Sequence, residues 1–208
     1  MQIDMEKAGE NAGYALLRNS VVPRPIALIT TVNAKGVINA APFSFFGVVC
    51  PDPPIVGVSI GRRGGEKKDT QVNIESSGEF VVNLVSEEMT QAMNMAGMDF
   101  PPEESEMGPA GFTALPGIKV RAPRVAQAAV SLECRLRDVL EFGHGEHAHA
   151  FVMGEVLLFH VRDDLWVDGR IDCLGLKALS RLGDNYYSPL REVFELKRLR
   201  YSDWKAGK

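Results

Sequence analysis

Cysteine is scarce in this chain, and long apolar runs are absent. The three cysteines among 208 residues lie far apart and form no Cys-x-x-Cys pair. They provide neither a disulfide framework nor a four-thiolate metal site, and a reducing cytoplasm is the expected compartment. No run approaches the roughly 18 apolar residues of a membrane span, and the amino end, with its acidic residues, is unlike a secretory signal. We therefore expect a cytoplasmic protein that does not associate with membranes.

Positive charge is not in excess either. The chain has 23 Lys and Arg residues against 27 Asp and Glu residues, which gives a formal net charge of −4. Binding to nucleic acids or to anionic membranes normally requires a basic surface, so we expect neither as a partner. Any anionic ligand must be bound by a local group of basic residues.

A Gly-x-Gly-x-x-Gly motif between a strand and a helix is also missing, which argues against a Rossmann unit. Instead, β-rich runs alternate with short helical patterns. We predict strands at residues 26–32, 37–41, 55–60, 79–85, 130–142 and 150–161, and helices at residues 69–77, 86–95 and 173–182. This pattern is typical of a mainly β fold with short helices, built as a closed or partly closed barrel.

The length of the chain predicts one domain. We assign residues 1–20 to an amino-terminal extension, residues 21–190 to the domain and residues 191–208 to a carboxy-terminal extension. Within the domain, residues 99–123 are rich in proline, glycine and glutamate. Such a long irregular segment in a compact domain is often a functional loop, so we predict that it covers a binding site.

The segment at residues 29–49 mixes small polar side chains with large rings. The polar residues are Thr30, Thr31, Asn39 and Ser44, and the rings belong to Phe43, Phe45 and Phe46. One interpretation is ordinary hairpin chemistry, because threonine favours strands and serine favours turns. The other is the wall of a binding site, in which the polar groups contact a phosphate or a heteroaromatic edge while the phenylalanines enclose the rest.

A basic segment follows the strand predicted at residues 55–60. Arg62 and Arg63 precede Lys68-Asp69-Thr70, where a helix is expected to begin with Asp69 or Thr70 as its cap. The free amides and the dipole at a helix start favour an anion, and Lys68 adds a charge. A solvated basic loop explains the same residues, but phosphate binding becomes the favoured interpretation once the polar wall is considered with it.

Several sequence blocks occur in a distinctive order. They include Pro23-Arg24-Pro25, Ala41-Pro42-Phe43-Ser44, Lys68-Asp69-Thr70 and, further on, SLECRLRDVLEFG, FVMGEV and SRLGDNYY. In this order, residues 22–187 resemble the flavin reductase-like family of FMN-binding split barrels, and more narrowly the branch that includes flavoredoxin. The resemblance implies a Greek-key split β-barrel that forms a homodimer and holds FMN near the subunit interface.

The resemblance also implies a set of cofactor contacts. Thr30, Thr31 and the strand at residues 39–46 would face the flavin, while Ser44 and residues 68–70 would lie toward its phosphate. The cofactor-binding residues expected on this basis are Thr30, Thr31, Asn39, Ala41, Phe43, Ser44, Phe45, Ser59, Arg62, Lys68, Asp69 and Thr70.

Two histidines precede the last long strand. Many short flavin reductases have a Gly-Asp-His signature ahead of a Gly-x-Val strand, and its histidine lies near the nicotinamide. In Gly145-Glu146-His147-Ala148-His149, His147 matches the preceding residues and His149 matches the distance to Gly154. Both are candidate nicotinamide contacts. They are equally compatible with a solvated turn, and since no third ligand is evident we expect no metal site.

The resemblance implies an FMN-binding oxidoreductase that transfers hydride from NAD(P)H to its flavin. The alternative is a flavoredoxin-like electron carrier that exchanges electrons with a redox protein partner and does not turn over nicotinamide. A flavin-binding module without redox turnover and a relative of the pyridoxamine-phosphate oxidases also remain open.

Overall fold

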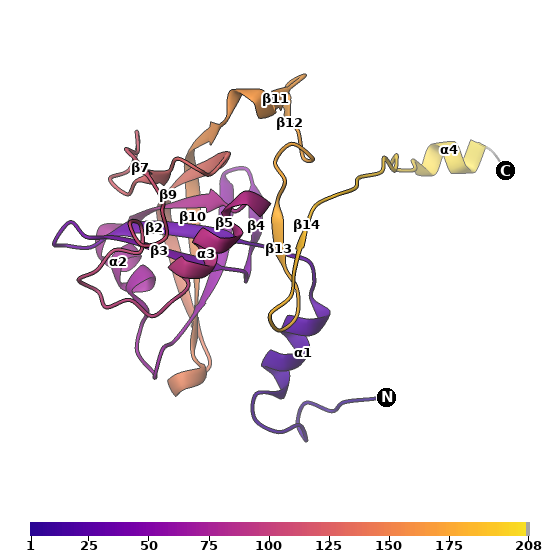
Figure 1. The fold of residues 1–208 in the computed structure, drawn as a ribbon. Coiled ribbons are helices and arrows are strands. Elements are labelled where there is room, and N and C mark those ends of the chain that lie inside the picture. The colour runs from indigo at the N-terminus through magenta and orange to yellow at the C-terminus, as the bar shows by residue number, and fades with distance from the viewer. Residues whose placement is uncertain (207–208) are drawn as a thin grey trace.

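A computed structural model describes residues 1–206 and places seven of the fourteen strands in one antiparallel sheet (Figure 1). Its seven strands occur in the order β3-β2-β6-β9-β10-β5-β4. Their bounds are Ala27–Val32 for β2, Ile38–Phe43 for β3, Phe46–Pro51 for β4, Pro54–Gly61 for β5, Glu79–Leu84 for β6, Val130–Phe142 for β9 and His149–Val161 for β10. The predicted mainly β fold is confirmed.

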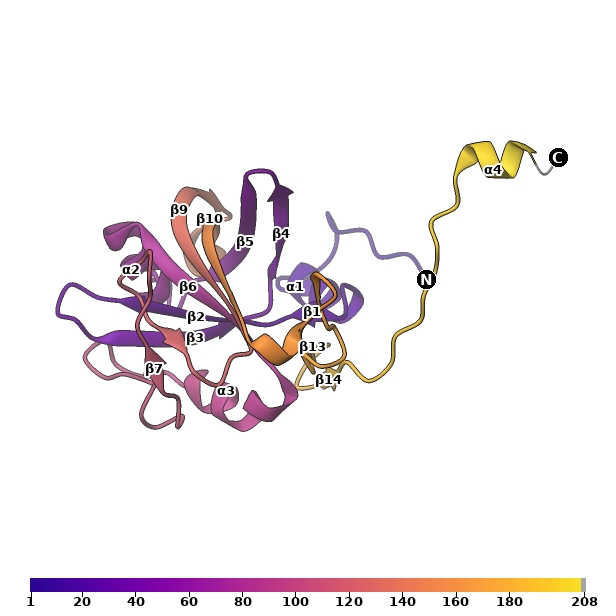
Figure 2. The same cartoon turned by 90° about the horizontal axis from the view of Figure 1, so that it is seen from above.

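The sheet is curled because its two edge strands are consecutive in the chain. Strands β3 and β4 lie at opposite edges, yet only Ser44 and Phe45 separate them. The edges must therefore meet at these residues, where the amide of Ser59 donates a hydrogen bond of 2.8 Å to the carbonyl of Phe45. Away from this seam the β2–β3 and β4–β5 hairpins point in different directions (Figure 2). This is the predicted Greek-key split barrel.

Short helices and small sheets surround the barrel. The helices are α1 (Ala12–Ser20), α2 (Asp69–Ser77), α3 (Thr90–Ala96) and α4 (Tyr201–Ala206), with 3-10 turns η1 (Glu87–Met89), η2 (Gly145–His147) and η3 (Asp163–Leu165). A three-stranded sheet joins β1 (Arg24–Pro25), β13 (Leu179–Arg181) and β14 (Tyr187–Pro189). Two pairs complete the fold: β7 (Ala114–Leu115) with β8 (Arg124–Val125), and β11 (Trp166–Val167) with β12 (Arg170–Ile171). Within residues 1–206, no helix has the length and apolar character needed to cross a membrane.

Three local predictions need correction. Residues 173–182 form a turn and strand β13, because the amide of Leu179 bonds to the carbonyl of Val85 and its side chain enters the core. The helix expected from residue 86 starts as the 3-10 turn η1 before α3. Helix α1 was not predicted, and it has no buried residue. Beyond β14 the chain runs away from the barrel and ends in α4 (Figure 1).

Two apolar cores lie on opposite faces of strand β2. Ala27 and Ile29 face the barrel interior, whereas Leu28 faces a second core beneath α3. The interior core also includes Phe43, Val58, Ile60, Ile74, Phe80, Val82 and Val152, and the second includes Ile26, Ala40, Met89, Met93, Met107 and Phe112. Strand β2 is therefore buried on both faces, and any polar side chain on it needs a partner within the protein.

Residues 99–123 are irregular, as predicted, but most of the segment is anchored. Met107 and Phe112 enter the second core, and Val120 and Ala122 form a third buried cluster with Val81. The segment thus packs as part of the barrel wall from residue 106 onward. Residues 99–105 contribute no side chain to these cores, and a covering role stays a prediction for this first part.

Glu133 on β9 fastens the end of this segment. Its fully buried carboxylate accepts hydrogen bonds of 2.5 to 3.1 Å from the amides of residues 118–120, and it lies 2.5 Å from Nε2 of His160. Burial alone would raise the pKa of Glu133, but the hydrogen bonds from His160 and the three amides outweigh it and lower the pKa.

Replacing this carboxylate tests the anchor. We expect Glu133→Gln to lower the free energy of unfolding by about 1.5–3 kcal/mol near neutral pH, because the amide nitrogen cannot accept the bonds. The pKa of Glu133 is lowered in the folded state, so this stabilisation is present above the unfolded pKa and is lost as pH falls through the folded pKa. The difference from wild type should shrink in acid, which urea unfolding at neutral and acidic pH measures.

Glu155→Gln is the matched control. Glu155 lies on the neighbouring strand β10, where it pairs with Arg135 at 3.2 Å near the surface, and such pairs contribute at most about 1 kcal/mol. Equal losses in the two variants would contradict the anchoring role of Glu133.

Candidate functional site

Two adjoining cavities open at the seam of the barrel. The larger has a volume of about 810 Å³ and the smaller about 240 Å³. Pro42, Phe43 and Lys68 line both, so the cavities meet where β3 ends and α2 begins. The larger cavity is also lined by Asn11, Gly13, Tyr14, Leu17, Ser44, Phe45, Ser59, Gly61, Arg62, Phe142, Gly143, Glu146, His147 and His149.

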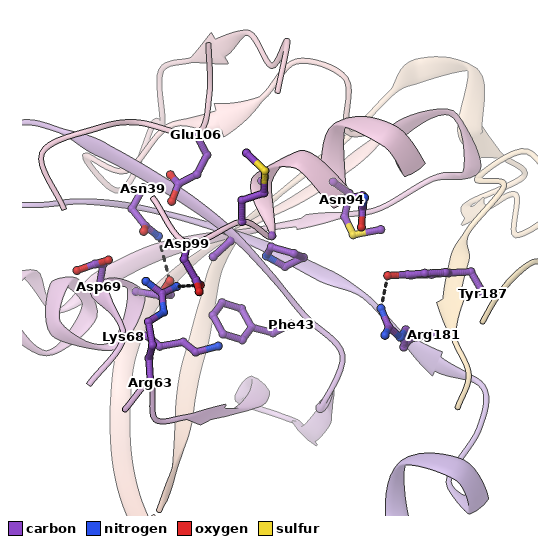
Figure 3. A pocket seen from close by; sticks show the side chains of 17 residues that line it. Asn39, Phe43, Arg63, Lys68, Asp69, Asn94, Asp99, Glu106, Arg181 and Tyr187 are labelled. Carbon is purple, nitrogen blue, oxygen red and sulfur yellow. Dashed lines mark hydrogen bonds and ion pairs between the residues drawn. The ribbon is translucent and has the colours of Figure 1, made fainter. Parts of the chain in front are cut away.

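The smaller cavity lies between strand β3 and helix α3. Asn39, Asp69 and Glu106 gather at one end, Arg181 and Tyr187 lie at the other, and Phe43 and Lys68 lie between them (Figure 3). The remaining lining residues are Ala41, Arg63, Thr70, Met93, Asn94, Ala96, Gly97, Met98 and Asp99.

The edge of β3 beside the smaller cavity has few free amides. Oε2 of Glu106 accepts a hydrogen bond of 2.8 Å from the amide of Ala40, and Pro42 has no amide to donate. The edge strand is thereby protected from pairing with another chain. Burial raises the pKa of Glu106, the nearby Asp69 adds to this effect, and the hydrogen bond from Ala40 opposes it.

The amino end of α2 faces both cavities without a side-chain cap. Lys68 occupies the cap position, where no side chain bonds to the first amides of the helix. The predicted caps, Asp69 and Thr70, are instead inside the first turn, and the Thr70 hydroxyl accepts a hydrogen bond of 2.9 Å from Nδ2 of Asn39. The helix start therefore keeps unsatisfied amides and its positive dipole end.

Lys68 is partly buried and has no carboxylate partner among the described residues. Its neighbours are paired: Lys67 with Glu75 at 2.6 Å and Arg63 with Asp99 at 2.8 Å. The Lys68 amine instead lies 5.8 Å from the centre of the Phe43 ring. Burial lowers the pKa of Lys68, and Arg63 lowers it further. A bound anion at this position would stabilise its charged form.

His149 is held at the far wall of the larger cavity. Its Nδ1 lies 3.1 Å from the hydroxyl of Ser59, and its ring is 6.3 Å from that of Phe45 at 23°. Burial lowers the pKa of His149, and Lys68 lowers it further, so the neutral ring is favoured at neutral pH. His147 lies in the 3-10 turn between β9 and β10 and is exposed.

The chain as a whole is similar to known proteins. A family model described as the flavin reductase like domain matches residues 18–174. The chain belongs to the flavin reductase-like family. Component B of nitrilotriacetate monooxygenase from Bacillus cereus is 38% identical, with a TM-score of 0.90 over 94% of this chain and 98% of that one. A 2-nitrobenzoate 2-nitroreductase from Pseudomonas fluorescens is 31% identical, with a TM-score of 0.86 over 97% and 98% of the two chains.

Flavoredoxin from Desulfovibrio vulgaris is similar at the level of the fold. It is 22% identical, with a TM-score of 0.73 over 100% of both chains. The predicted membership of the flavin reductase-like family is thus confirmed, and the likeness to flavoredoxin is one of fold.

The structure of this family member gathers most of the predicted site residues. Every residue on the predicted list except Thr30 and Thr31 lines one of the two cavities. Phe43, Ser44, Phe45, Ser59, Arg62, His147 and His149 line the larger one, and Asn39, Ala41, Asp69 and Thr70 line the smaller, with Lys68 at the junction. Residues from β3, β5, α2 and β10 are therefore brought together as the resemblance implied.

Thr30 and Thr31 lie elsewhere, because both faces of β2 are buried. The Thr30 hydroxyl donates to the carbonyl of Pro123 and accepts a hydrogen bond of 3.2 Å from Nδ2 of Asn83. Thr31 accepts a hydrogen bond of 3.0 Å from Nδ2 of Asn73 on α2. Neither hydroxyl reaches a cavity. For these two residues the hairpin interpretation fits better than the binding wall.

Several lining residues are absent from the predicted list, among them residues of and after α3 (Met93, Asn94, Ala96, Gly97 and Met98) and of the β9–β10 turn (Phe142, Gly143 and Glu146). Two further groups come from other parts of the chain. Helix α1 contributes one wall of the larger cavity, and strands β13 and β14 contribute Arg181 and Tyr187 to the smaller. Both groups are distant in sequence from the blocks at residues 41–44 and 68–70, and only the tertiary fold brings them to the cavities. Arg181 and Tyr187 lie within the recognised block SRLGDNYY, but no site role was predicted for them. Within residues 1–206, no group of three His, Cys, Asp or Glu side chains is arranged to hold a metal ion.

Thr30 and Ser44 provide a test of this division. We expect Thr30→Val to lower the free energy of unfolding by about 1–3 kcal/mol, because it leaves buried partners unsatisfied, and to leave flavin affinity unchanged. Ser44→Ala should leave the free energy of unfolding unchanged and weaken flavin binding, since the Ser44 side chain lines the cavity. Urea unfolding measures the free energy of unfolding, and fluorescence titration measures flavin affinity. A large loss of flavin affinity in Thr30→Val would show that Thr30 belongs to the binding site after all.

Proposed function

We propose that this protein binds FMN and transfers hydride from NAD(P)H to it. The observation that carries the proposal is the uncapped amino end of α2, where Lys68 has no ion-pair partner among the described residues and faces both cavities. Free amides, a positive dipole end and an unpaired amine together favour a phosphate. The acidic chain as a whole would repel one, so recognition has to be local.

The remaining surfaces fit the other parts of FMN. The rings of Phe43 and Phe45 provide apolar walls, and the hydroxyl of Ser44 and the side chain of Asn39 provide polar groups beside them. A planar, polar-edged ring system needs this combination. Lys68, Thr70 and Ser44 would then lie toward the phosphate, and Phe43 and Phe45 toward the ring.

The acidic residues restrict where the phosphate can lie. Asp69, Asp99 and Glu106 all line the smaller cavity. Asp99 is paired with Arg63, and burial raises the pKa of Glu106, so part of this negative charge is neutralised. Asp69 has no ion-pair partner among residues 1–206. The junction at Lys68, rather than the acidic end of the smaller cavity, is therefore the proposed phosphate position.

A flavin supplies the capacity to accept a hydride from a dihydronicotinamide, so the protein has to position both rings and exclude competing reactions. His149, held by Ser59 and favoured in its neutral form, presents an uncharged ring at the cavity wall. No acid, base or nucleophile is required of the side chains. This agrees with a cavity that contains aromatic, hydroxyl and basic groups but no triad.

The relatives support a redox role of this kind. Two proteins more than 30% identical to this chain are a monooxygenase component and a nitroreductase. The likeness to flavoredoxin, at lower identity, keeps an electron-carrier role as the second candidate.

Anaerobic reduction separates these two functions. If the protein is a nicotinamide-dependent reductase, NADH or NADPH should bleach the visible absorbance of the FMN-loaded protein within the mixing time, and added free FMN should sustain NAD(P)H oxidation. An electron carrier should be bleached by dithionite but not by either nicotinamide. The second result would reject the hydride-transfer proposal and leave flavin binding intact.

Lys68 allows the phosphate position to be tested. A charge-assisted hydrogen bond typically contributes about 1.5–3 kcal/mol, so Lys68→Ala should weaken FMN binding by roughly tenfold to a hundredfold. Riboflavin, which lacks the phosphate, should bind wild type and variant almost equally. Fluorescence quenching measures both affinities.

Lys67→Ala is the control for Lys68→Ala. Lys67 is adjacent in sequence but bonds to Glu75 and lines neither cavity, so its loss should leave FMN affinity within about twofold. Equal losses for FMN and riboflavin in Lys68→Ala would show that the phosphate lies elsewhere.

We also propose that the chain forms a homodimer. Edge strand β4 exposes Val48 and Val49, and the segment after β14 exposes Phe194, Leu196 and Leu199. Exposed apolar residues on this scale favour burial against another subunit. A monomeric mass in light scattering of the flavin-loaded protein would contradict this.

A further inference from the structure

Helix α1 faces the larger cavity although it contributes nothing to the core. None of its residues is buried, yet Tyr14 and Leu17, and Asn11 and Gly13 at its amino end, line the cavity. Tyr14 and Leu17 are three positions apart and therefore share one face of the helix. Their side chains are 51% and 56% exposed. A helix that turns two large apolar side chains toward an open cavity leaves them in water until something fills the space between.

The helix is fastened at one end only. Arg24 donates hydrogen bonds of 2.6 and 2.7 Å to the carbonyls of Arg18 and Val21, and Arg18 pairs with Asp184. These contacts hold residues 18–21. In the part of the chain that the structure describes, the side chains of Tyr14 and Leu17 make no such hydrogen bond or ion pair. Only packing therefore holds them toward the cavity.

Three rings follow one another along the cavity. The ring of Tyr14 lies 6.2 Å from that of Phe45, and the ring of Phe45 lies 6.3 Å from that of His149. Arg18 packs over Tyr14 at 5.3 Å, and Arg24 packs over Phe45 at 5.6 Å, which restricts both rings. Such a row of aromatic surfaces favours a planar aromatic ligand, because offset or edge-to-face pairs form at centroid distances of about 4.5–7 Å.

The volume leaves room for a second ring. Ligand cavities commonly occupy about 300–1,000 Å³, and the larger cavity, at about 810 Å³, is near the upper end of that range. A flavin placed along the barrel wall, from Lys68 past Phe43, would leave α1 facing it across the cavity.

We propose that Tyr14 and Leu17 of helix α1 contact the second substrate through a flat, unsaturated six-membered ring with a polar substituent, and set the selectivity for it. The inference rests on the proposed function, because that function supplies the flavin beside which this ring would lie. Both a nicotinamide and an aromatic electron acceptor have the required chemistry, so the experiment uses one probe for each.

The first arm measures turnover with NADH. Tyr14→Ala and Leu17→Ala should raise the KM for NADH by roughly threefold to tenfold, the range expected for one lost aromatic contact. The kcat and the Kd for FMN should change by less than about twofold, because the lost contact is to the second substrate only. Tyr14→Phe, which keeps the ring, should behave as wild type.

The second arm measures equilibrium binding of 2-nitrobenzoate to the purified protein by calorimetry, without a reductant. Weaker binding to Tyr14→Ala with an unchanged KM for NADH would assign the α1 wall to an aromatic acceptor. A raised KM for NADH with unchanged binding of 2-nitrobenzoate would assign the α1 wall to the nicotinamide. This arm remains decisive if wild type does not oxidise NADH, a result that would reject the proposed function by itself.

Leu16→Ala is the matched control, because Leu16 lies on the same helix but does not line the cavity. Thermal melts should be equal for all four variants, since α1 contributes no buried residue. Unchanged KM and unchanged 2-nitrobenzoate affinity in Tyr14→Ala would overturn the inference. Leu16→Ala should leave the KM for NADH and the affinity for 2-nitrobenzoate unchanged. If it alters them as much as Tyr14→Ala does, the inference is overturned as well, because the effect would then come from the helix as a whole.

Discussion

The arrangement of this protein depends on a chain that supplies both edges of its own sheet with two residues between them. Because β3 and β4 occupy opposite edges, the turn at Ser44 and Phe45 forces those edges together and curls the sheet. The edges meet only at this turn, and the β2–β3 and β4–β5 hairpins separate away from it. Cavities form on both sides of the junction, and the residues at the turn line them. The candidate site is thus a direct consequence of how the barrel closes.

Polar side chains near the seam divide into two classes according to burial. Those on β2 are enclosed on both faces, and each one bonds to another protein group: Thr30 to Pro123 and Asn83, Thr31 to Asn73. Those at the end of β3 and the start of α2 border open space. Among them Lys68, which is partly buried, has no ion-pair partner among residues 1–206 and lies over the ring of Phe43. The first class stabilises the fold, and the second provides unsatisfied groups for a ligand.

Segments outside the barrel complete the walls of both cavities. Helix α1 precedes the barrel strands and strands β13 and β14 follow them, and buried Arg24 connects these parts through bonds to the carbonyls of Arg18, Val21 and Leu182. Arg24 also packs over Phe45 in the larger cavity. Arg24 therefore links the position of α1 to that of the Phe45 ring. Through this link the amino-terminal extension and the barrel together line the larger cavity.

The sequence by itself determined six of the seven strands of the main sheet, the turn at Gly36, the helix over residues 69–77 and the blocks that identify the family, because these depend on local propensity and on residues close together in the chain. It did not reveal edge strand β4, Phe46–Pro51. It also determined nearly all of the lining residues on β3, β5, α2 and β10. Only the tertiary structure decided that Thr30 and Thr31 serve the core, since alternation along β2 cannot reveal that both faces are covered. It likewise decided that residues 179–181 form strand β13 beside β1 and that α1 faces the larger cavity. Those outcomes depend on contacts between distant segments, such as Leu179 with Val85 and Tyr14 with Phe45, whose energies outweigh local preference.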